Sequence, residues 1–595
     1  MIKFPGILNS TRHFWLPTFL AGITLLAVMS CNSADFQSQG VKISQLVQNI
    51  LSDPKTFNYA LSQESPNIFN LTFEGLVTEN PISGTIEPAL AQSWQISDDK
   101  LKIVFTLRPN LKWSDGKPLN TDDVVFTYNK IYFNEEIPTD ARDILRIGQS
   151  RQLPKVRKIN NDQVEFITSE PFSPLLRTAG LSILPAHALR KSVNTKDSEG
   201  RPQFLTKWGV GTPPNELITN GPYKLERYHT SQRVIFRKNP YYWRKGEEGE
   251  SQPYIERIIW QIVESTDTSL LQFRSGSLDA INITPEYFSL LKQEEKRGDF
   301  TIYNGGPTPT RLFMFFNLNK GKRDGKPLVN PIKSRWFNNT AFRQAVVYGI
   351  NRQRMINNTY RGLGVLQNSP IADQSPYYLS PQEGLRVYKY NPAKARQLLI
   401  KAGFNYNKQG ELFDKYGNQV RFTLLTNAGN KIREAIGAQI KQDLGEIGIK
   451  VDFIPMAWSA YTDKLSNSLD WDAGILGFGA GVEPNDSANL WSTDGGLHIF
   501  NQKPQAGQEP IQGREIANWE KEIEQLYIQG AQEFDDAKRK IIYAKTQKIT
   551  QEYLPFIYLV NPYSMEAIKN RFKGIQYSAL SGAFWNIHEI KMVEN

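Results

Sequence analysis

A strand, a helix and a second strand follow one another between residues 421 and 453, and this order restricts the fold more than any other feature. Residues 421–426 have the composition of a strand, and residues 449–453 alternate apolar and charged side chains as a half-buried strand does. Between them, Gly448 ends a helix whose apolar positions recur at helical spacing, namely Ile432, Ile436, Ile440, Leu444 and Ile447. Such a unit favours parallel strands, so we predict α/β architecture.

Other segments also carry local sequence signals for strands and for the ends of helices. Residues 101–107 alternate as a half-buried strand, and Asn120 or Thr121 is placed to cap a helix that begins with two aspartates. Asn391 before Pro392 predicts another helix start, and Gly403 predicts its end. These segments add further predicted strands and helices to the unit at 421–453.

Composition excludes several classes of function. The net charge of +10 is spread over 595 residues without a run of five like charges, so no nucleic-acid partner is implied. One cysteine cannot form an internal disulfide or a zinc cluster, and five scattered histidines supply little metal chemistry. We predict no metal site and no cofactor.

The N-terminus has the order of an export signal. Lys3 and Arg12 precede an apolar run from Phe14 to Met29, which is short for a membrane-spanning helix and suits a secretory leader over residues 1–30. The only cysteine follows at Cys31, in a segment that resembles a bacterial lipobox. That resemblance implies lipidation of Cys31, with residues 31–40 as a tether to the membrane.

Motifs for catalysis do not fit this sequence. The Gly116–Lys117 and Gly325–Lys326 pairs are each followed by proline and lack the spacing of a phosphate-binding loop, and Val482 occupies the place of the third glycine in a dinucleotide fingerprint. The metalloprotease and nucleophile-elbow patterns do not occur in the sequence. Adjacent carboxylates such as Asp122 and Asp123 point apart in a helix or strand and cannot act as one acid–base pair. We predict a protein that is not an enzyme and has no catalytic residue.

A long series of short motifs resembles the family 5 extracellular solute-binding proteins, the oligopeptide- and dipeptide-binding proteins of ABC importers. In its first part the matching segments are Glu74–Val77, Pro88–Ala91, Trp94, Ser97–Asp99, Phe105–Arg108, Trp113–Pro118, Asp122–Val124 and Phe126. The similarity continues in the same order through Leu184–His187, Asn220–Tyr223, Arg237–Pro240, Tyr242–Trp243, Phe273, Gly276, Leu278, Asp279, Phe316–Asn319, Phe342–Ala345, Ile350–Arg352, Tyr390–Pro392, Gly445–Val451 and Leu554–Ile557.

The resemblance implies a two-lobed periplasmic-binding-protein clamshell of type II, in the family 5 variant with an extra subdomain. The ligand would be enclosed between the lobes as they close by hinge motion. The expected division of the chain is lobe I from 41–78, 205–306 and 556–595, the extra subdomain from 79–204, and lobe II from 307–555.

The resemblance also indicates where the ligand binds. Peptide binders of this family place an aromatic residue and an aspartate in a glycine-rich segment, where the carboxylate pairs with the α-amino group of the peptide. Phe478 stands at the aromatic position here, but Gly481 stands where the aspartate is expected. Either Glu483 or Asp486 replaces the charge from a shifted position, or the ligand lacks an α-ammonium group. Gly479 and Asn485 complete this segment.

Further cleft candidates lie in loops near the contact regions of the family: Asn67, Arg142, Asn427, Trp458 and Trp491. For aromatic residues the competing interpretation is a place in the core, because most rings of a large protein are buried there. Trp458 could equally be a packing residue of a surface loop.

The function that the resemblance implies is that of a substrate-binding receptor. We expect a periplasmic, lipid-anchored monomer that captures peptides and delivers them to an ABC permease with its ATPase subunits. Within the same fold an oligosaccharide, a nickel chelate or an opine is an alternative ligand, and an acidic ligand could exploit the basic excess. Outside this class, a secreted hydrolase or a periplasmic scaffold lipoprotein remains open.

Overall fold

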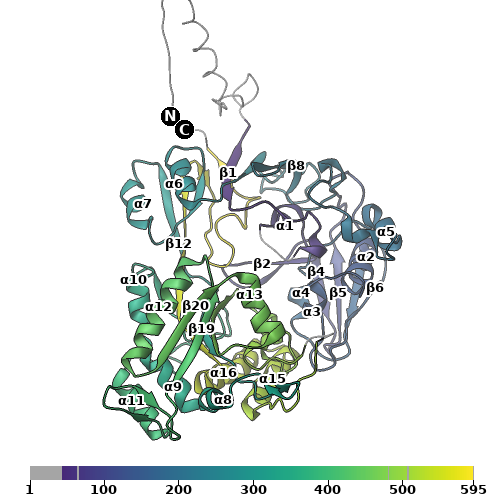
Figure 1. The fold of residues 1–595 in the computed structure, drawn as a ribbon. Coiled ribbons are helices and arrows are strands. Elements are labelled where there is room, and N and C mark those ends of the chain that lie inside the picture. The colour runs from purple at the N-terminus through teal and green to yellow at the C-terminus, as the bar shows by residue number, and fades with distance from the viewer. Residues whose placement is uncertain (1–42, 63–65, 480, 505–507, 594–595) are drawn as a thin grey trace, which may run out of the picture. The chain divides into compact units, whose positions relative to one another are not determined.

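The strand–helix–strand unit predicted between residues 421 and 453 is present and parallel (Figure 1). β19 (Arg421–Asn427) pairs in parallel with β20 (Lys450–Met456), and α12 (Lys431–Glu446) connects the two strands and packs on both. Of the predicted apolar positions, Ile436, Ile440, Leu444 and Ile447 are fully buried, whereas Ile432 in the first turn of α12 is 38% exposed. Burial of this helix stripe on the sheet is what stabilises the unit.

The computed structural model describes residues 43–62, 66–479, 481–504 and 508–593. Residues 45–595 group as one compact unit, and the description below concerns this unit. The leader over residues 1–30, Cys31 and the tether over 31–40 lie outside the described residues. Within the described ranges, no helix has the length and apolar character needed to cross a membrane.

The largest sheet is mixed and has five strands in the order β20–β19–β21–β13–β22. β19 is parallel to both of its neighbours, whereas β13 is antiparallel to β21 and β22. The added strands are β21 (Ala473–Phe478), β13 (Arg311–Phe316) and β22 (Phe556–Tyr558). β13 is buried at all six positions, as expected for a central strand covered on both faces.

Three four-stranded sheets complete the framework, and two of them join distant parts of the chain. The first has the order β1 (Gln45–Ile50), β10 (Arg257–Ile262), β9 (Arg233–Lys238) and β8 (Tyr223–His229). In the second, β23 (Val560–Lys569) lies between β11 (Ala280–Asn282) and β12 (Phe300–Pro307) and also pairs with β16 (Gly364–Leu366). The third has the order β4 (Ala91–Ile96), β5 (Lys102–Leu107), β7 (Gln163–Ile167) and β6 (Lys155–Lys158).

Short strand pairs and helices fill the spaces between these sheets. The pairs are β2 (Val77–Glu79) with β3 (Ile86–Pro88), β14 (Lys322–Arg323) with β15 (Lys326–Pro327), β17 (Asn405–Tyr406) with β18 (Leu412–Phe413), and β24 (Phe572–Lys573) with β25 (Lys591–Met592). The helices other than α12 are α1 (Phe69–Thr72), α2 (Thr121–Phe126), α3 (Ala141–Ile144), α4 (Leu175–Thr178), α5 (Ala186–Asn194), α6 (Thr266–Arg274), α7 (Phe288–Glu294), α8 (Pro331–Phe337), α9 (Thr340–Gly349), α10 (Arg352–Asn358), α11 (Pro392–Lys401), α13 (Trp458–Asp463), α14 (Ala488–Trp491), α15 (Asn518–Gln532) and α16 (Asp536–Tyr553).

The local sequence signals predict element boundaries well. The Asn120 side chain caps α2 and forms a capping box with Asp123, and Asn391 caps α11 by accepting a hydrogen bond from the Lys394 N–H. β5 alternates buried and half-buried residues over 102–107, as the period-2 pattern predicts. These signals succeed because caps and alternating patterns depend on neighbours along the chain.

Two strands pair with strands from the other side of an expected lobe boundary, and the lobe division itself stays a prediction. Residues 556–558 form β22 in the sheet of β13, although the expected division placed residues from 556 onward in lobe I. Residues 364–366, expected in lobe II, pair as β16 with β23. Both differences arise at Leu559, where the chain passes directly from β22 to β23 and so from one sheet to the next.

Candidate functional site

A cavity of 980 Å³ is formed by segments that are far apart in the sequence. Its walls come mainly from residues 67–89, 177–182 and the C-terminal loop 576–589, with single residues from β1, β10, β11 and β23. Of the described residues in 307–555, only Asp486 lines it. Ligand sites in proteins commonly have roughly 300–1,000 Å³, so this cavity has room for a solute of several residues.

Acidic side chains outnumber basic ones in the described lining of the cavity. The acidic residues are Glu74, Glu79, Glu87, Asp486, Glu566 and Glu589, and the arginines are Arg177 and Arg244. The net charge of +10 for the chain therefore does not describe its cavity. An excess of carboxylates favours a ligand that carries positive charge.

Both arginines already face carboxylates of the wall. Arg177 forms an ion pair with Glu79, and the Arg244 Nε lies 3.9 Å from Glu74 Oε1. Glu74 also accepts a hydrogen bond of 2.6 Å from the Trp243 indole N–H. The positive charges of these two arginines are thus compensated by Glu79 and Glu74. They do not compensate the other carboxylates of the cavity wall.

The predicted glycine-rich segment contributes Asp486 to the cavity. Phe478 ends β21 and its ring centroid lies 5.4 Å from that of Phe313, so it packs at the edge of the core. Gly479 is exposed. At Gly481, a Cβ would lie 2.7 Å from Asp486 Oδ2. The glycine therefore leaves the space that the Asp486 carboxylate occupies, which gives a physical reason for glycine where the family pattern has aspartate.

Asp486 has an unusual electrostatic environment. The side chain is accessible through the cavity, and among the described residues it takes part in no ion pair. The surrounding walls still remove much of its water, and this burial, together with the charge of Glu483, raises the pKa of Asp486 to about 7. A cationic ligand would reverse this effect by stabilising the ionised form.

Glu483, the other candidate for the missing charge, is held inside the protein. It is 3% exposed, and its Oε1 lies 2.7 Å from Arg539 Nη2 of α16. The same oxygen accepts a hydrogen bond from the Asn485 N–H at 3.1 Å, and Arg177 Nε lies 4.0 Å from Oε2. The carboxylate of Glu483 is therefore committed to internal partners, and half-buried Asn485 contributes its backbone to this arrangement.

Asn67 is the other predicted residue that lines the cavity. It is exposed, and its Oδ1 accepts a hydrogen bond of 3.3 Å from the Phe69 N–H just before α1. Its amide NH₂ group remains available as a donor towards the cavity, because the amide has two further N–H bonds. Asn67 and Asp486 are the two predicted side chains that the structure brings to the same cavity.

Four predicted residues lie elsewhere. Trp491 is 1% exposed and stacks on Tyr527 in the core, so the core interpretation of this ring describes its position. Trp458 is 54% exposed at the start of α13. Asn427 accepts a hydrogen bond of 2.8 Å from Arg433, and Arg142 donates to backbone carbonyls before α3. None of the four is among the described lining of the cavity.

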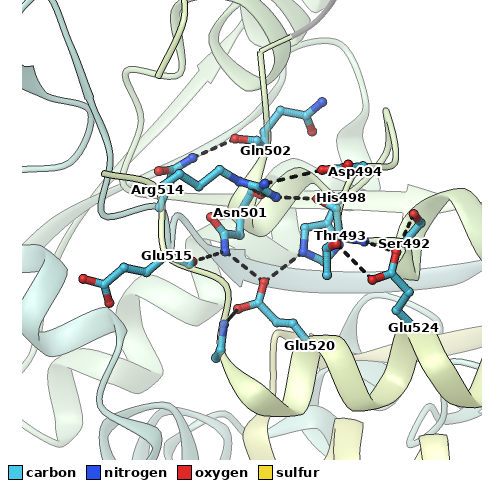
Figure 2. Close-up of polar contacts among 12 residues, drawn as sticks. Ser492, Thr493, Asp494, His498, Asn501, Gln502, Arg514, Glu515, Glu520 and Glu524 are labelled. Atoms are coloured by element: carbon cyan, nitrogen blue, oxygen red, sulfur yellow. Dashed lines mark hydrogen bonds and ion pairs between the residues drawn. The ribbon is translucent and has the colours of Figure 1, made fainter. Parts of the chain in front are cut away.

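A buried polar network fixes the chain that follows Asp486 (Figure 2). His498 lies with Nε2 2.9 Å from Glu520 Oε2, and Asn501 donates to the same carboxylate at 2.9 Å. Glu524 accepts hydrogen bonds from Ser492 and Thr493 at 2.8 and 3.0 Å. Because Glu520 and Glu524 both belong to α15, the network attaches residues 492–501 to that helix and thereby limits the movement of the Asp486 segment.

Sequence reasoning missed Glu566 and the C-terminal loop. Glu566 is 7% exposed in β23, and burial raises its pKa to about 7, opposed by a hydrogen bond from the Ala583 N–H. Nearby in the lining, burial and the charge of Arg244 lower the pKa of His588 to about 3. The available signal is a carboxylate between two apolar residues, Met565 and Ala567. Its meaning depends on the cavity, which the sequence does not reveal.

The described residues contain no group of three His, Cys, Asp or Glu side chains that could hold a metal ion. The polar groups that line the cavity are carboxylates, amides, hydroxyls, two arginines and a histidine. Such groups can fix the orientation of a bound ligand.

Comparison with known proteins gives a consistent result. The family model of the bacterial extracellular solute-binding proteins, family 5, middle region, matches residues 85–499. A probable ABC transporter-binding protein of Deinococcus radiodurans is 30% identical over 533 residues, covering 86% of this chain and 85% of the relative.

Two solved structures show the fold. The oligopeptide-binding protein AppA of Bacillus subtilis in complex with a nonapeptide has a TM-score of 0.69 at 21% identity, covering 92% of this chain and 99% of that one. NikA of Brucella suis in complex with Fe(III)-EDTA has a TM-score of 0.73 at 20% identity, covering 92% and 100%. The fold is therefore the mixed α/β, two-lobed type II periplasmic-binding-protein fold that the resemblance implied. With most of its length matched by the family model, the chain belongs to the family 5 bacterial extracellular solute-binding proteins.

Proposed function

We propose that this protein is the receptor of an ABC importer that captures peptides with a free N-terminus and delivers them to a membrane permease. One observation carries the proposal: Asp486, from the segment where the family places its amine-binding aspartate, lines the cavity without an internal ion-pair partner among the described residues. An α-ammonium group is the peptide feature that fits an unpaired carboxylate at this place.

The proposal extends to architecture and location. Lobe I comprises 41–78, 205–306 and 556–595, with 79–204 as its extra subdomain, and lobe II comprises 307–555. The two lobes close on the ligand, which is bound but not chemically changed. After removal of residues 1–30, lipidation of Cys31 would hold the receptor at the membrane beside its permease, as a monomer.

The comparisons support the peptide and also show what else the fold accommodates. AppA was solved with a nonapeptide, whereas NikA was solved with Fe(III)-EDTA, which is an anionic chelate. The acidic excess of the cavity wall in this chain disfavours an anionic ligand and favours an amine. Electrostatics therefore supports the peptide over the chelate.

The test compares Asp486 with an exposed carboxylate outside the described cavity lining. Mature protein is freed of carried ligand by denaturation and refolding, and its binding to a pool of free and N-acetylated peptides is measured by native mass spectrometry. We expect wild type to bind the free peptides, and Asp486→Asn to lose the preference for a free N-terminus. Glu264→Gln is the matched control for the loss of one negative charge; it should keep the preference of wild type.

Three results would contradict the proposal. Equal binding of free and acetylated peptides by wild type would remove the role of the amine. Binding of no peptide from the pool, with a non-peptide ligand found on the purified protein, would favour another solute. The appearance of cleaved peptides would indicate a hydrolase.

A further inference from the structure

Glu566 is a buried carboxylate at the cavity that no cationic side chain of the described residues pairs with. It is 7% exposed and lines the cavity, yet no ion pair among the described residues involves it. A buried charge without a partner is costly, and proteins usually pair or neutralise such groups. A buried carboxylate without an ion-pair partner at a ligand cavity therefore suits a ligand that carries a positive charge.

The position of Glu566 is defined by the sheet. It lies on β23, opposite Asn282 of β11 and Tyr303 of β12 in register, so these three side chains share one face. Asn282 also lines the cavity, and the Tyr303 ring stacks on Tyr577 with centroids 6.0 Å apart. The carboxylate therefore projects from a rigid element rather than from a loop.

The C-terminal loop closes over this carboxylate. A Cβ at Gly582, which has φ +71°, would lie 3.7 Å from Glu566 Oε2, so the loop backbone runs beside the carboxylate. The Ala583 N–H donates one hydrogen bond to Glu566, which leaves further acceptor positions of the carboxylate unused. The aromatic residues Trp260, Phe584 and Trp585 line the same cavity and offer apolar surface and ring faces.

Glu566 and Asp486 come from different elements of the cavity wall. Asp486 belongs to the segment after β21, whereas Glu566 belongs to β23 in a different sheet. The charges with the largest influence on Asp486 are those of Glu483, Arg177, Glu79 and Arg311. The cavity thus offers two carboxylates, each of which accepts from a cationic donor.

We propose that Glu566 forms a second subsite that binds the cationic side chain of a lysine or arginine residue in the peptide. This inference rests on the proposed function and deepens it, because it assigns the receptor to basic peptides. The alkyl part of the side chain would lie along the aromatic residues, where a cation also gains from the ring faces. The ammonium or guanidinium group would donate to the unused acceptor positions of Glu566.

The experiment uses pairs of peptides that differ only in charge. A library of pentapeptides with free N-termini contains, at each position in turn, either lysine or norleucine, which lacks the ammonium group but has a side chain of similar length. The library is bound to ligand-free wild type, Glu566→Gln and Glu264→Gln, and the enrichment of each member is measured by mass spectrometry. Glu264 is exposed and lies outside the described cavity lining, so its substitution controls for the loss of one negative charge.

At one or more positions, we expect wild type and Glu264→Gln to enrich lysine peptides over their norleucine partners by roughly tenfold to a hundredfold, the range of a buried charge-assisted hydrogen bond. Glu566→Gln should abolish this ratio and retain norleucine peptides, which also shows that the variant is folded. An unchanged ratio in Glu566→Gln, or no lysine preference in wild type, overturns the subsite while peptide binding stands. If wild type enriches no peptide of either kind, the proposed function itself fails, and the subsite with it.

Discussion

Replacing Glu566 by glutamine tests, without any ligand, whether this carboxylate is as poorly solvated as its place implies. Burial raises its pKa from 4.5 to about 7, so the folded protein holds a proton that the unfolded chain releases between these values. Wherever the folded state binds more protons, stability falls as pH rises. Glutamine keeps the shape and a neutral charge, so the variant should escape this loss.

The size of the effect follows from the two pKa values. At 1.36 kcal/mol per pKa unit, the folded-state penalty is about 0.8 kcal/mol at pH 5 and about 3.3 kcal/mol at pH 8. The free energy of unfolding of Glu566→Gln, minus that of wild type, should therefore rise by about 2.5 kcal/mol from pH 5 to pH 8. Because Glu566 is 7% exposed, little solvent screening reduces this figure.

The assay is urea denaturation of ligand-free wild type and variant at both pH values. His588 acts in the opposite direction: its pKa is lowered to about 3, so its contribution to stability is lost as pH falls below its unfolded-state value of 6.5. That contribution is common to both proteins and cancels in the difference. A difference that stays constant from pH 5 to pH 8 would refute the reasoning, because it would mean that Glu566 ionises like a solvated carboxylate.

Three further outcomes are expected. Glu483→Gln breaks the buried pair with Arg539 and should lower the free energy of unfolding by about 3–5 kcal/mol, measured by thermal or urea denaturation. If the lost pair is the cause, the double variant with Arg539→Gln should be destabilised by much less than the sum of the two single variants. The affinity for free-N-terminal peptides should fall about fivefold from pH 8 to pH 6. The pKa of Asp486 is about 7, so its ionised fraction falls about tenfold, while protonation of the peptide α-amino group, whose ordinary pKa is about 8, rises about twofold. Calorimetry should show this fall in wild type but not in Asp486→Asn. Trp491→Ala truncates a core side chain and should lower the free energy of unfolding by about 3–5 kcal/mol. The ratio of free to acetylated peptide binding should stay unchanged. A selective loss of free-peptide binding would instead mean that Trp491 takes part in binding.

The success and failure of the predictions for single residues have one physical cause. The sequence predicts Asn391 as a cap, and Asn120 as one of two candidates beside Thr121, because a cap bonds to a backbone N–H two or three residues away. Trp491 could not be assigned in this way, since its partners Tyr527 and Phe556 come from other parts of the chain. The two alternatives for the missing charge, Glu483 and Asp486, are three residues apart, and only Arg539 from α16 distinguishes their environments.

By itself, the sequence determined the family and the parallel strand–helix–strand unit at 421–453, and it predicts the segment in which a ligand carboxylate should lie. These features depend on periodicity, on caps and turns, and on motifs whose order along the chain is specific. The tertiary structure alone decided which carboxylates have partners among the described residues: it brings Arg539 to Glu483, leaves Asp486 at the cavity, and places Glu566 of β23 beside the C-terminal loop without an ion-pair partner. Whether a carboxylate has an ion-pair partner depends on distances between residues that are far apart in the sequence, and no local sequence pattern encodes those distances.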